Sequence, residues 1–369
     1  MTLKGRPAFA AALNLGRCVT LLALLLVSSS CASVPLQRQG DRGDCTDVRD
    51  GVGDKELHRL RTDEGLATAR LQRGLQSWDS TTRYKALDVL LTRVEPQTLL
   101  SPLLTMVQDD DPRVRATSVG GLATAVAAQA TLSPQLLPLI TQARQDRDPG
   151  VRAASFSGLA AVAERQKPLR SQILPLFKQG LQDRSACVRA TAASSLDYLF
   201  ALSVPTRHEL KPLLPDLLTM ATSDASAWAR SHAVMSLGPA SVNAAESVVV
   251  LVTIVQQDPD AGLRSVAVSG LGYYQAAEPA ATQAILAAMN DPDERVRTAA
   301  VYSLLNIDPN PFRHRSQAQQ LSNQGLQTAI WELKESAKDP YVNQQQKTAI
   351  PPILETLMVE QRARWLRER

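Results

Sequence analysis

A phrase built around an arginine recurs seven times along the chain and constrains the fold more than any other feature. Seven residues after each arginine lies a leucine, and three residues after it lies alanine or serine. The spacings between successive arginines are 32, 37, 37, 41, 34 and 33 residues, which is the range of helical repeat units. The arginines are Arg83, Arg115, Arg152, Arg189, Arg230, Arg264 and Arg297, and their leucines are Leu90, Leu122, Leu159, Leu196, Leu237, Leu271 and Leu304.

The offsets within the phrase predict an α-helix. An apolar residue before the arginine, the small residue after it and the leucine are four positions apart, so they lie on one helix face. In four units an Asp-Pro pair comes first, and we expect the aspartate to cap the helix and the proline to occupy its first turn. These pairs are Asp111-Pro112, Asp148-Pro149, Asp258-Pro259 and Asp291-Pro292.

A second apolar segment precedes each phrase and predicts a partner helix. Ahead of Arg115, for example, Leu99, Leu103 and Val107 recur at helical spacing. Each unit is therefore predicted to be two helices joined by an Asp-rich turn. One such unit cannot bury its own apolar faces, whereas stacked units can, so the predicted fold is an all-α solenoid.

The pattern D-x-x-V-R-x-x-A-x-x-x-L resembles the second helix of HEAT repeats. The short period and the Asp-Pro turn are most similar to the HEAT-like subtype named after the phycobilisome lyases. The resemblance runs from about Gln76 to Asn306. It implies a superhelix at residues 55–310 that binds partner proteins on its concave face, and a helical cap at residues 311–369.

The repeated arginines allow two interpretations. They could form a row of positive charges that binds a ligand. However, a residue that recurs identically in every unit more often has a structural role. We expect each arginine to pair with the turn aspartate of its own or the adjacent unit and to fix the stacking. The sequence assigns no binding residues beyond this ladder.

The first thirty residues resemble a bacterial lipoprotein signal peptide. Basic residues precede the apolar run CVTLLALLLV, which is too short to span a bilayer, and small residues then lead to Cys31. The resemblance implies lipidation of Cys31, a flexible tether at residues 31–54, and a membrane-anchored location in the cell envelope. Ser28 departs from the pattern, because an apolar residue is usual there. Ordinary cleavage after Ala32 is the alternative and implies a soluble, secreted or periplasmic protein.

The C-terminal residues lack the repeated phrase. Apolar spacing predicts one helix around Leu321 to Leu333 and another around Ile350 to Trp365. Terminal units of a solenoid are atypical because they cover its last apolar face. The basic, amphipathic ending EQRARWLRER leaves a membrane-surface or partner contact as the alternative to a solvated helix.

Composition argues against nucleic-acid binding. The formal charge is +4, but Lys4, Arg6 and Arg17 lie in the signal region, which leaves about +1 for the rest. Aromatic residues make up 4% of the chain, too few to provide a series of stacking platforms. Of the four cysteines, Cys45 and Cys187 would remain after export and lipidation. We expect them to be unpaired thiols because no disulfide spacing is evident, and a Cys45–Cys187 disulfide in an oxidising compartment is the alternative.

No catalytic or metal motif is evident, so we predict a non-enzymatic binding protein without cofactor or metal. The single His208-Glu209 pair does not build the iron site of deoxyhypusine hydroxylase, a HEAT-like enzyme. Bilin-lyase activity is an alternative suggested by the shared repeat subtype. It fits less well, because those enzymes act in the cytoplasm whereas this chain begins with an export-like signal. A ligand- or glycan-binding groove is another, with aromatic hints at Trp228, Tyr273 and Tyr274. The histidines are His58, His208, His232 and His314.

Overall fold

The computed structural model describes residues 68–202, 208–237, 244–274, 278–305, 318–338 and 344–368. These residues form α-helices and short 3₁₀-helices, and no strand occurs among them. The predicted all-α solenoid is confirmed. The predicted signal peptide, the tether with Cys31 and the boundary at residues 310–311 lie outside the described residues.

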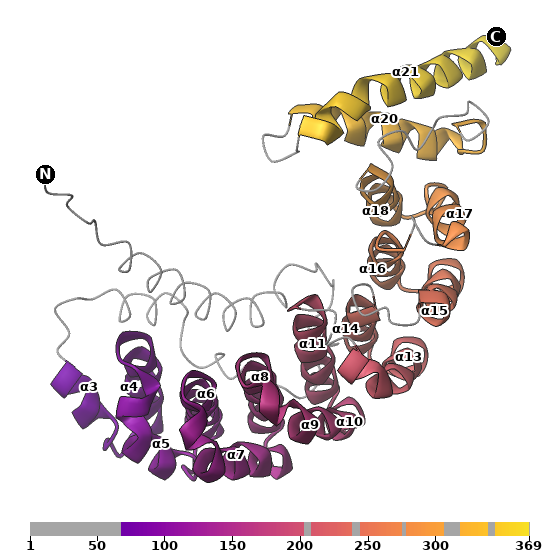
Figure 1. Cartoon of the computed structure of the whole chain (residues 1–369). Helices are drawn as coiled ribbons and strands as arrows, with labels where there is room; N and C mark the ends of the chain where they lie inside the picture. Colours follow the sequence, from indigo (N-terminus) through magenta and orange to yellow (C-terminus); the bar gives the residue numbers. More distant parts are fainter. Residues whose placement is uncertain are drawn as a thin grey trace, which may run out of the picture. The chain divides into compact units, whose positions relative to one another are not determined.

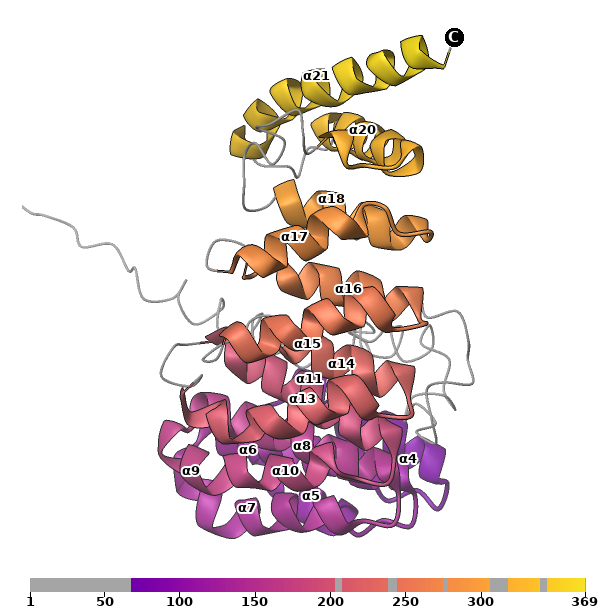
Figure 2. The same cartoon turned by 90° about the vertical axis from the view of Figure 1, so that its right-hand side faces the viewer.

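Two rows of helices form the repeat region (Figures 1 and 2). Each helix of the second row packs on the next, and the later helices of the first row do the same. Each unit contributes one helix to each row. The first helices are α3 (Thr68–Gly74), α5 (Leu100–Met106), α7 (Ser133–Gln142), α10 (Phe177–Leu181), α13 (Leu214–Ser223), α15 (Ala244–Gln257) and α17 (Pro279–Ala288). The second helices are α4 (Ser80–Arg93), α6 (Pro112–Ala128), α8 (Pro149–Arg165), α11 (Ala186–Leu202), α14 (Ala227–Leu237), α16 (Ala261–Leu271) and α18 (Glu294–Leu305).

Proline breaks the first helix of the fourth unit, which carries Arg189, into shorter pieces. In the fourth unit, α9 (Arg170–Ile173) passes through the 3₁₀-helix η6 (Leu174–Leu176) before α10 begins. Pro175 lies in that 3₁₀ segment, where its missing N–H interrupts the α-helical hydrogen bonds. The second helices α6 and α8 have no internal proline and run for 17 residues each.

The caps of the second helices correct part of the sequence prediction. Asp111 and Asp148 cap α6 and α8, with proline at the next position, as expected. Asp258 does not cap α16, because Asp260 does so two residues later. In the seventh unit Asp293, not Asp291, accepts from the N–H of Arg295 in the first turn of α18. The Asp-Pro pair therefore occupies two different places in the turn.

Small residues bring the second helices together. A Cβ built on Gly158 of α8 would lie 2.7 Å from the Cβ of Ala123 in α6. Between α14 and α11 the hydroxyl of Ser236 donates to the backbone carbonyl of Ala193 at 2.8 Å. Gly158 and Ser236 lie six positions after their repeat arginines. The repeat leucines next to this position are fully buried at Leu90, Leu122, Leu159, Leu196, Leu237 and Leu271.

Two longer helices, α20 (Asn323–Lys338) and α21 (Gln344–Arg367), follow the repeats. Helix α20 packs on α18, and α21 packs on α20. The buried apolar residues of α21 are Ile350, Ile353 and Leu357, which recur at helical spacing. No helix in the described part of the chain is long and apolar enough to span a bilayer.

Candidate functional site: the inter-unit ladder and its basic groove

The repeat arginines bridge neighbouring units. Arg152 of α8 donates from Nε and a terminal nitrogen to the carboxylate of Asp183, at 2.9 and 2.7 Å. Asp183 lies in the turn of the next unit, 31 residues along the chain. The other terminal nitrogen of Arg152 donates to the backbone carbonyls of Asp146 and Arg147 in its own turn. One guanidinium therefore holds two consecutive turns in a planar, bidentate geometry.

Each turn aspartate in turn joins two arginines. The carboxylate of Asp146 accepts from Arg115 of the preceding unit, while its backbone carbonyl accepts from Arg152 of its own unit. The same carboxylate also accepts from the N–H of Asp148, which fixes the turn. These aspartates all lie six residues before a repeat arginine. They are Asp109, Asp146, Asp183, Asp224, Asp258 and Asp291.

The ladder weakens at one step and changes partner at its end. Arg230 approaches Asp258 no closer than 3.4 Å, and its buried Nε has no hydrogen-bond partner. Arg297, in the seventh unit, donates from Nε to the hydroxyl of Thr328 in α20 at 3.0 Å. The sixth step, from Arg264 to Asp291, has the regular bidentate form.

Arginine and backbone N–H groups lower the pKa of the two ladder carboxylates Asp146 and Asp183. Burial on its own raises the pKa of Asp183, but the hydrogen bonds from Arg152 and from the N–H of Ser185 outweigh it and leave the pKa below its usual value. Asp146 has a lowered pKa through the same balance, with Arg115 as its cation. These aspartates therefore stay charged and committed to arginine under ordinary conditions.

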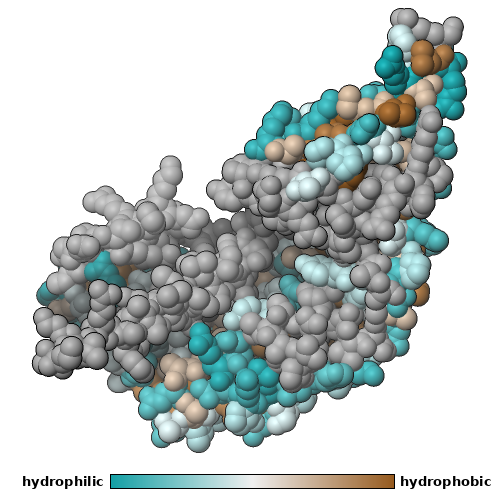
Figure 3. Space-filling model, turned by 45° about the horizontal axis from the view of Figure 1, so that its top comes forward, coloured by the Kyte–Doolittle hydropathy of each residue, from teal (hydrophilic) through white to brown (hydrophobic). Residues whose placement is uncertain are grey.

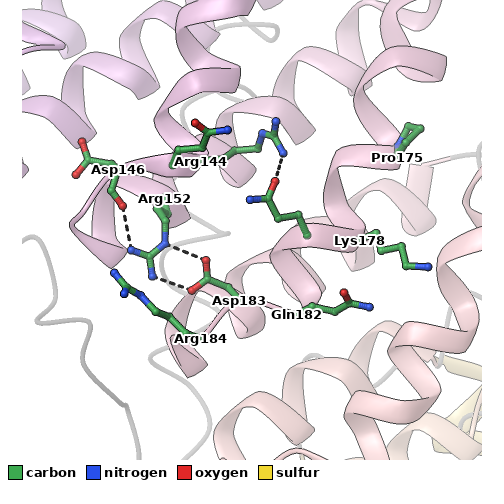
Figure 4. Close-up of a pocket in the computed structure, with 10 residues that line it drawn as sticks. Arg144, Asp146, Arg152, Pro175, Lys178, Gln182, Asp183 and Arg184 are labelled. Atoms are coloured by element: carbon green, nitrogen blue, oxygen red, sulfur yellow. Dashed lines mark hydrogen bonds and ion pairs between the residues drawn. The ribbon is translucent and has the colours of Figure 1, made fainter.

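A polar groove of about 680 Å³ lies between the third and fourth units, beside the Arg152–Asp183 pair (Figure 4). Arg144 and Gln145 of the 3₁₀-helix η4 (Ala143–Gln145) line one side. Lys178, Gln179 and the following turn line the other. The full lining is Arg144, Gln145, Asp146, Arg152, Pro175, Lys178, Gln179, Gln182, Asp183 and Arg184.

Positive charge in this groove is not balanced by its carboxylates. Asp146 is bound by Arg115, and Asp183 is bound by Arg152. Arg144, Lys178 and Arg184 make no ion pair with any described residue. The groove therefore presents three cations to an incoming group and suits an anion, above all a carboxylate that accepts from two of them.

Arg144 is the half-buried member of this set. Its Nε donates to the carbonyl of Thr141 at 3.0 Å, and a terminal nitrogen donates to the side-chain oxygen of Gln179 across the groove. Burial lowers the pKa of Arg144. Eight residues before the other repeat arginines of units two to seven the chain has Val107, Leu181, Thr222, Gln256 and Met289. A cation at this position is thus particular to the third unit.

The other residues singled out in the sequence do not form one site. His208 is exposed, and the neighbouring Glu209 lies 3.5 Å from Arg170. His232 is buried and contacts Trp228 edge-to-face, and burial lowers its pKa to about 4. Neither Trp228 nor the tyrosine pair lines the groove. Tyr274 is buried and donates its hydroxyl to the carbonyl of Leu237, whereas Tyr273 is exposed. His58 and His314 lie outside the described residues.

The expectation of an unpaired thiol at Cys187 is wrong. Cys187 is buried at the start of α11 and is disulfide-bonded. Its partner and Cys45 lie outside the described residues. The sequence offered no spacing signal for this bond, because the cysteines are far apart and isolated. Among the described residues no group of three or more His, Cys, Asp and Glu side chains is placed to hold a metal ion.

Comparison with known proteins identifies the repeat. The family model for HEAT repeats matches residues 68–160, 214–305 and 248–350, which together are more than half of the chain. No curated protein sequence matches the chain.

Solved structures show the same fold at low sequence identity. The X-ray structure of Escherichia coli YibA is 16% identical, with a TM-score of 0.53, over 81% of this chain and 95% of that one. Yeast importin-β, Kap95p, in a structure with RanGDP, is 14% identical with a TM-score of 0.50. The match covers 79% of this chain but only 41% of Kap95p. At these identities the likeness concerns the fold alone.

Proposed function

Because the chain belongs to the HEAT-repeat family, we propose that it is a scaffold that binds a partner protein, with the basic groove between its third and fourth units as a contact. The partner supplies an acidic segment, whose carboxylates meet Arg144, Lys178 and Arg184. Kap95p, which has the same fold, binds the protein RanGDP, and this supports a protein as the ligand. The proposed function is binding rather than catalysis.

The observation that carries this proposal is the excess of cations in the groove. Asp146 and Asp183 are each already paired with a ladder arginine. An incoming carboxylate can therefore bind the other cations of the groove without displacing either aspartate. Arg144 is already desolvated and held by neutral groups. A half-buried cation of this kind gains more from an added anion than a fully exposed cation does.

A peptide binding experiment tests the groove directly. Fluorescently labelled octaglutamate is titrated with the purified chain, and octaglutamine serves as the neutral probe. We expect octaglutamate to bind and the triple variant Arg144→Gln, Lys178→Gln and Arg184→Gln to bind it at least about tenfold more weakly. The matched control removes three exposed lysines that do not line the groove, Lys167, Lys211 and Lys334, by the same change to glutamine.

Equal binding by the groove variant and the control variant would contradict the proposal. Binding of a neutral glycan or small ligand in the groove, without binding of octaglutamate, would support the alternative of a ligand-binding solenoid. Circular dichroism of both triple variants establishes that the fold is intact.

We further propose that the chain is exported and anchored through lipidated Cys31, with the tether at residues 31–54 carrying the repeats away from the membrane. The signal-like N-terminal sequence supports export. The disulfide at Cys187 also supports it, because structural disulfides persist mainly in oxidising compartments.

Fractionation of cells tests the anchor. We expect the native chain in the membrane fraction and Cys31→Ala in the soluble fraction of the envelope. A Cys31→Ala chain that stays with the membrane would contradict lipid anchoring at this residue. A native chain found in the cytoplasm would contradict export and revive lyase-like alternatives.

A further inference from the structure

The last helix exposes large apolar side chains, unlike most of the second helices. Met358, Val359, Trp365 and Leu366 of α21 are 46%, 48%, 50% and 60% exposed. Brown apolar residues among teal ones mark this end of the molecule in Figure 3. A terminal unit of a solenoid normally presents a polar outer face to water. The outer face of the terminal helix α21 is therefore apolar rather than polar.

Met358, Val359 and Trp365 line a groove of about 940 Å³ along α20 and α21. Leu326 and Gln327 of α20 form one wall. The other wall is α21, whose lining residues are Pro351, Leu354, Glu355, Met358, Val359, Gln361, Arg362, Arg364, Trp365 and Glu368. The shape and apolar lining suit the side chains of an additional helix.

The exposed stripe of α21 has one charged residue of each sign near its middle. Leu354, Met358, Trp365 and their neighbours recur at helical spacing, so they share one face. Glu355 and Arg362 lie on the same face, seven residues apart, and both are exposed. Neither makes an ion pair with another described residue. The stripe is thus apolar with a balanced pair of charges.

We propose that this surface binds a second copy of the chain, with the two α21 helices antiparallel about a two-fold axis that passes between Met358 and Val359. This register places Glu355 opposite the partner's Arg362, and by symmetry each Arg362 opposite the partner's Glu355. The self-complementary contact is the isologous kind that closes a dimer. It also sets Pro351 opposite the partner's Leu366, so that an apolar contact lies outside each ion pair.

Charge complementarity favours a second copy over an anionic lipid surface. A lipid surface of negative charge attracts Arg362 but repels Glu355, which lies in the same stripe. An antiparallel second copy satisfies both residues at once. On the buried side, Glu360 is already paired with Arg364 and Arg367, so two of the arginines near the C-terminus are not available to phosphates.

Charge reversal tests the register. The full-length chain carrying Cys31→Ser, which removes the proposed lipid site, is examined by sedimentation equilibrium. We expect a reversible dimer of twice the 40.0 kDa chain mass. Glu355→Arg and Arg362→Glu should each raise the dimer dissociation constant by about tenfold or more, because like charges then face each other. The double variant Glu355→Arg, Arg362→Glu should restore it to near the starting value.

Val249→Glu is the control, since Val249 is a similarly exposed apolar residue on α15, far along the chain from α21. It should leave the dimer unchanged. A monomer at every concentration would overturn the proposal. So would a dimer that the single reversals do not weaken, or a double variant no better than the singles. Stable binding to anionic vesicles by a monomeric chain would favour the lipid surface instead.

Discussion

Arg152 and Asp183 form a bidentate ion pair across the junction of two repeat units, at 2.9 and 2.7 Å, although 31 residues separate them. Both side chains are nearly buried, 6% and 10% exposed. The neighbouring step of the ladder shares Asp146 with this pair, through the carbonyl of that residue. The ion pair therefore joins the third unit to the fourth through side chains, and the carbonyl of Asp146 links it to the preceding step.

Replacing Asp183 by asparagine should destabilise the fold by roughly 3 kcal/mol, because Arg152 is left nearly buried without its counter-charge. Asparagine retains an oxygen to accept from the N–H of Ser185, so the turn itself is preserved. The matched change is Asp258→Asn, where the two contacts from Arg230 are longer, at 3.4 and 3.5 Å, and we expect a loss of about 1 kcal/mol.

Urea unfolding of the two variants makes this comparison. Equal losses, or a larger loss for Asp258→Asn, would show that the length of the two contacts does not set the strength of a ladder step.

Two glycines on neighbouring second helices should respond oppositely to alanine. Gly158→Ala places a methyl group 2.7 Å from the Cβ of Ala123, which sits on a packed helix, so we expect a loss of about 1–3 kcal/mol. Gly120 has no atom within 4 Å of a built Cβ, so Gly120→Ala should gain about 0.5–1 kcal/mol from helix propensity. Thermal melts of both variants are the measurement. A stabilised Gly158→Ala chain would refute the close approach of α6 and α8.

His232 should make the fold sensitive to mild acid. Burial lowers its pKa from 6.5 to about 4, so the unfolded chain binds the proton more readily than the folded chain. Stability is therefore full above pH 6.5 and falls as the pH drops towards 4, by up to roughly 3 kcal/mol. His232→Leu should flatten the stability profile within this window. Identical pH profiles for the variant and the native chain would contradict the assignment.

Asp197 should act in the opposite sense. Burial raises its pKa from 3.8 to about 6, so the folded chain holds the proton more tightly than the unfolded chain. Its contribution falls as the pH rises from about 4 to 6, and at pH 7.5 the charged form costs about 2 kcal/mol, reduced for its partial exposure. Asp197→Asn should raise the melting temperature at pH 7.5 but not at pH 4. A lower melting temperature at pH 7.5 would contradict this.

The repeat arginine and its leucine were sufficient to predict the fold, because period and helical spacing are local properties of the sequence. The positions of the ladder aspartates could also be predicted from the sequence. They lie six residues before the arginines of units two to seven, whereas the Asp-Pro pairs mark a position that shifts between units. Asp148 is a cap, whereas Asp258 is a ladder residue, and only the geometry separates the two roles.

The basic groove was beyond sequence reasoning for a different reason. Arg144 and Lys178 are 34 residues apart, and their charges matter only because the nearby carboxylates of Asp146 and Asp183 are already bound. Which arginine each aspartate binds is a tertiary fact. The exposed apolar surface of α21 could not be predicted either. Apolar residues at helical spacing do not show which face of a helix is covered by its neighbours.

The most direct test of the scaffold function is photo-crosslinking in intact cells from Gln179, inside the groove. We predict that a crosslinkable residue there captures a discrete protein through a segment rich in Asp and Glu. The yield should collapse in the Arg144→Gln, Lys178→Gln, Arg184→Gln chain but not in the Lys167→Gln, Lys211→Gln, Lys334→Gln chain. An unchanged yield in the groove variant, or capture through a neutral or basic segment, would contradict an acidic partner bound at this groove.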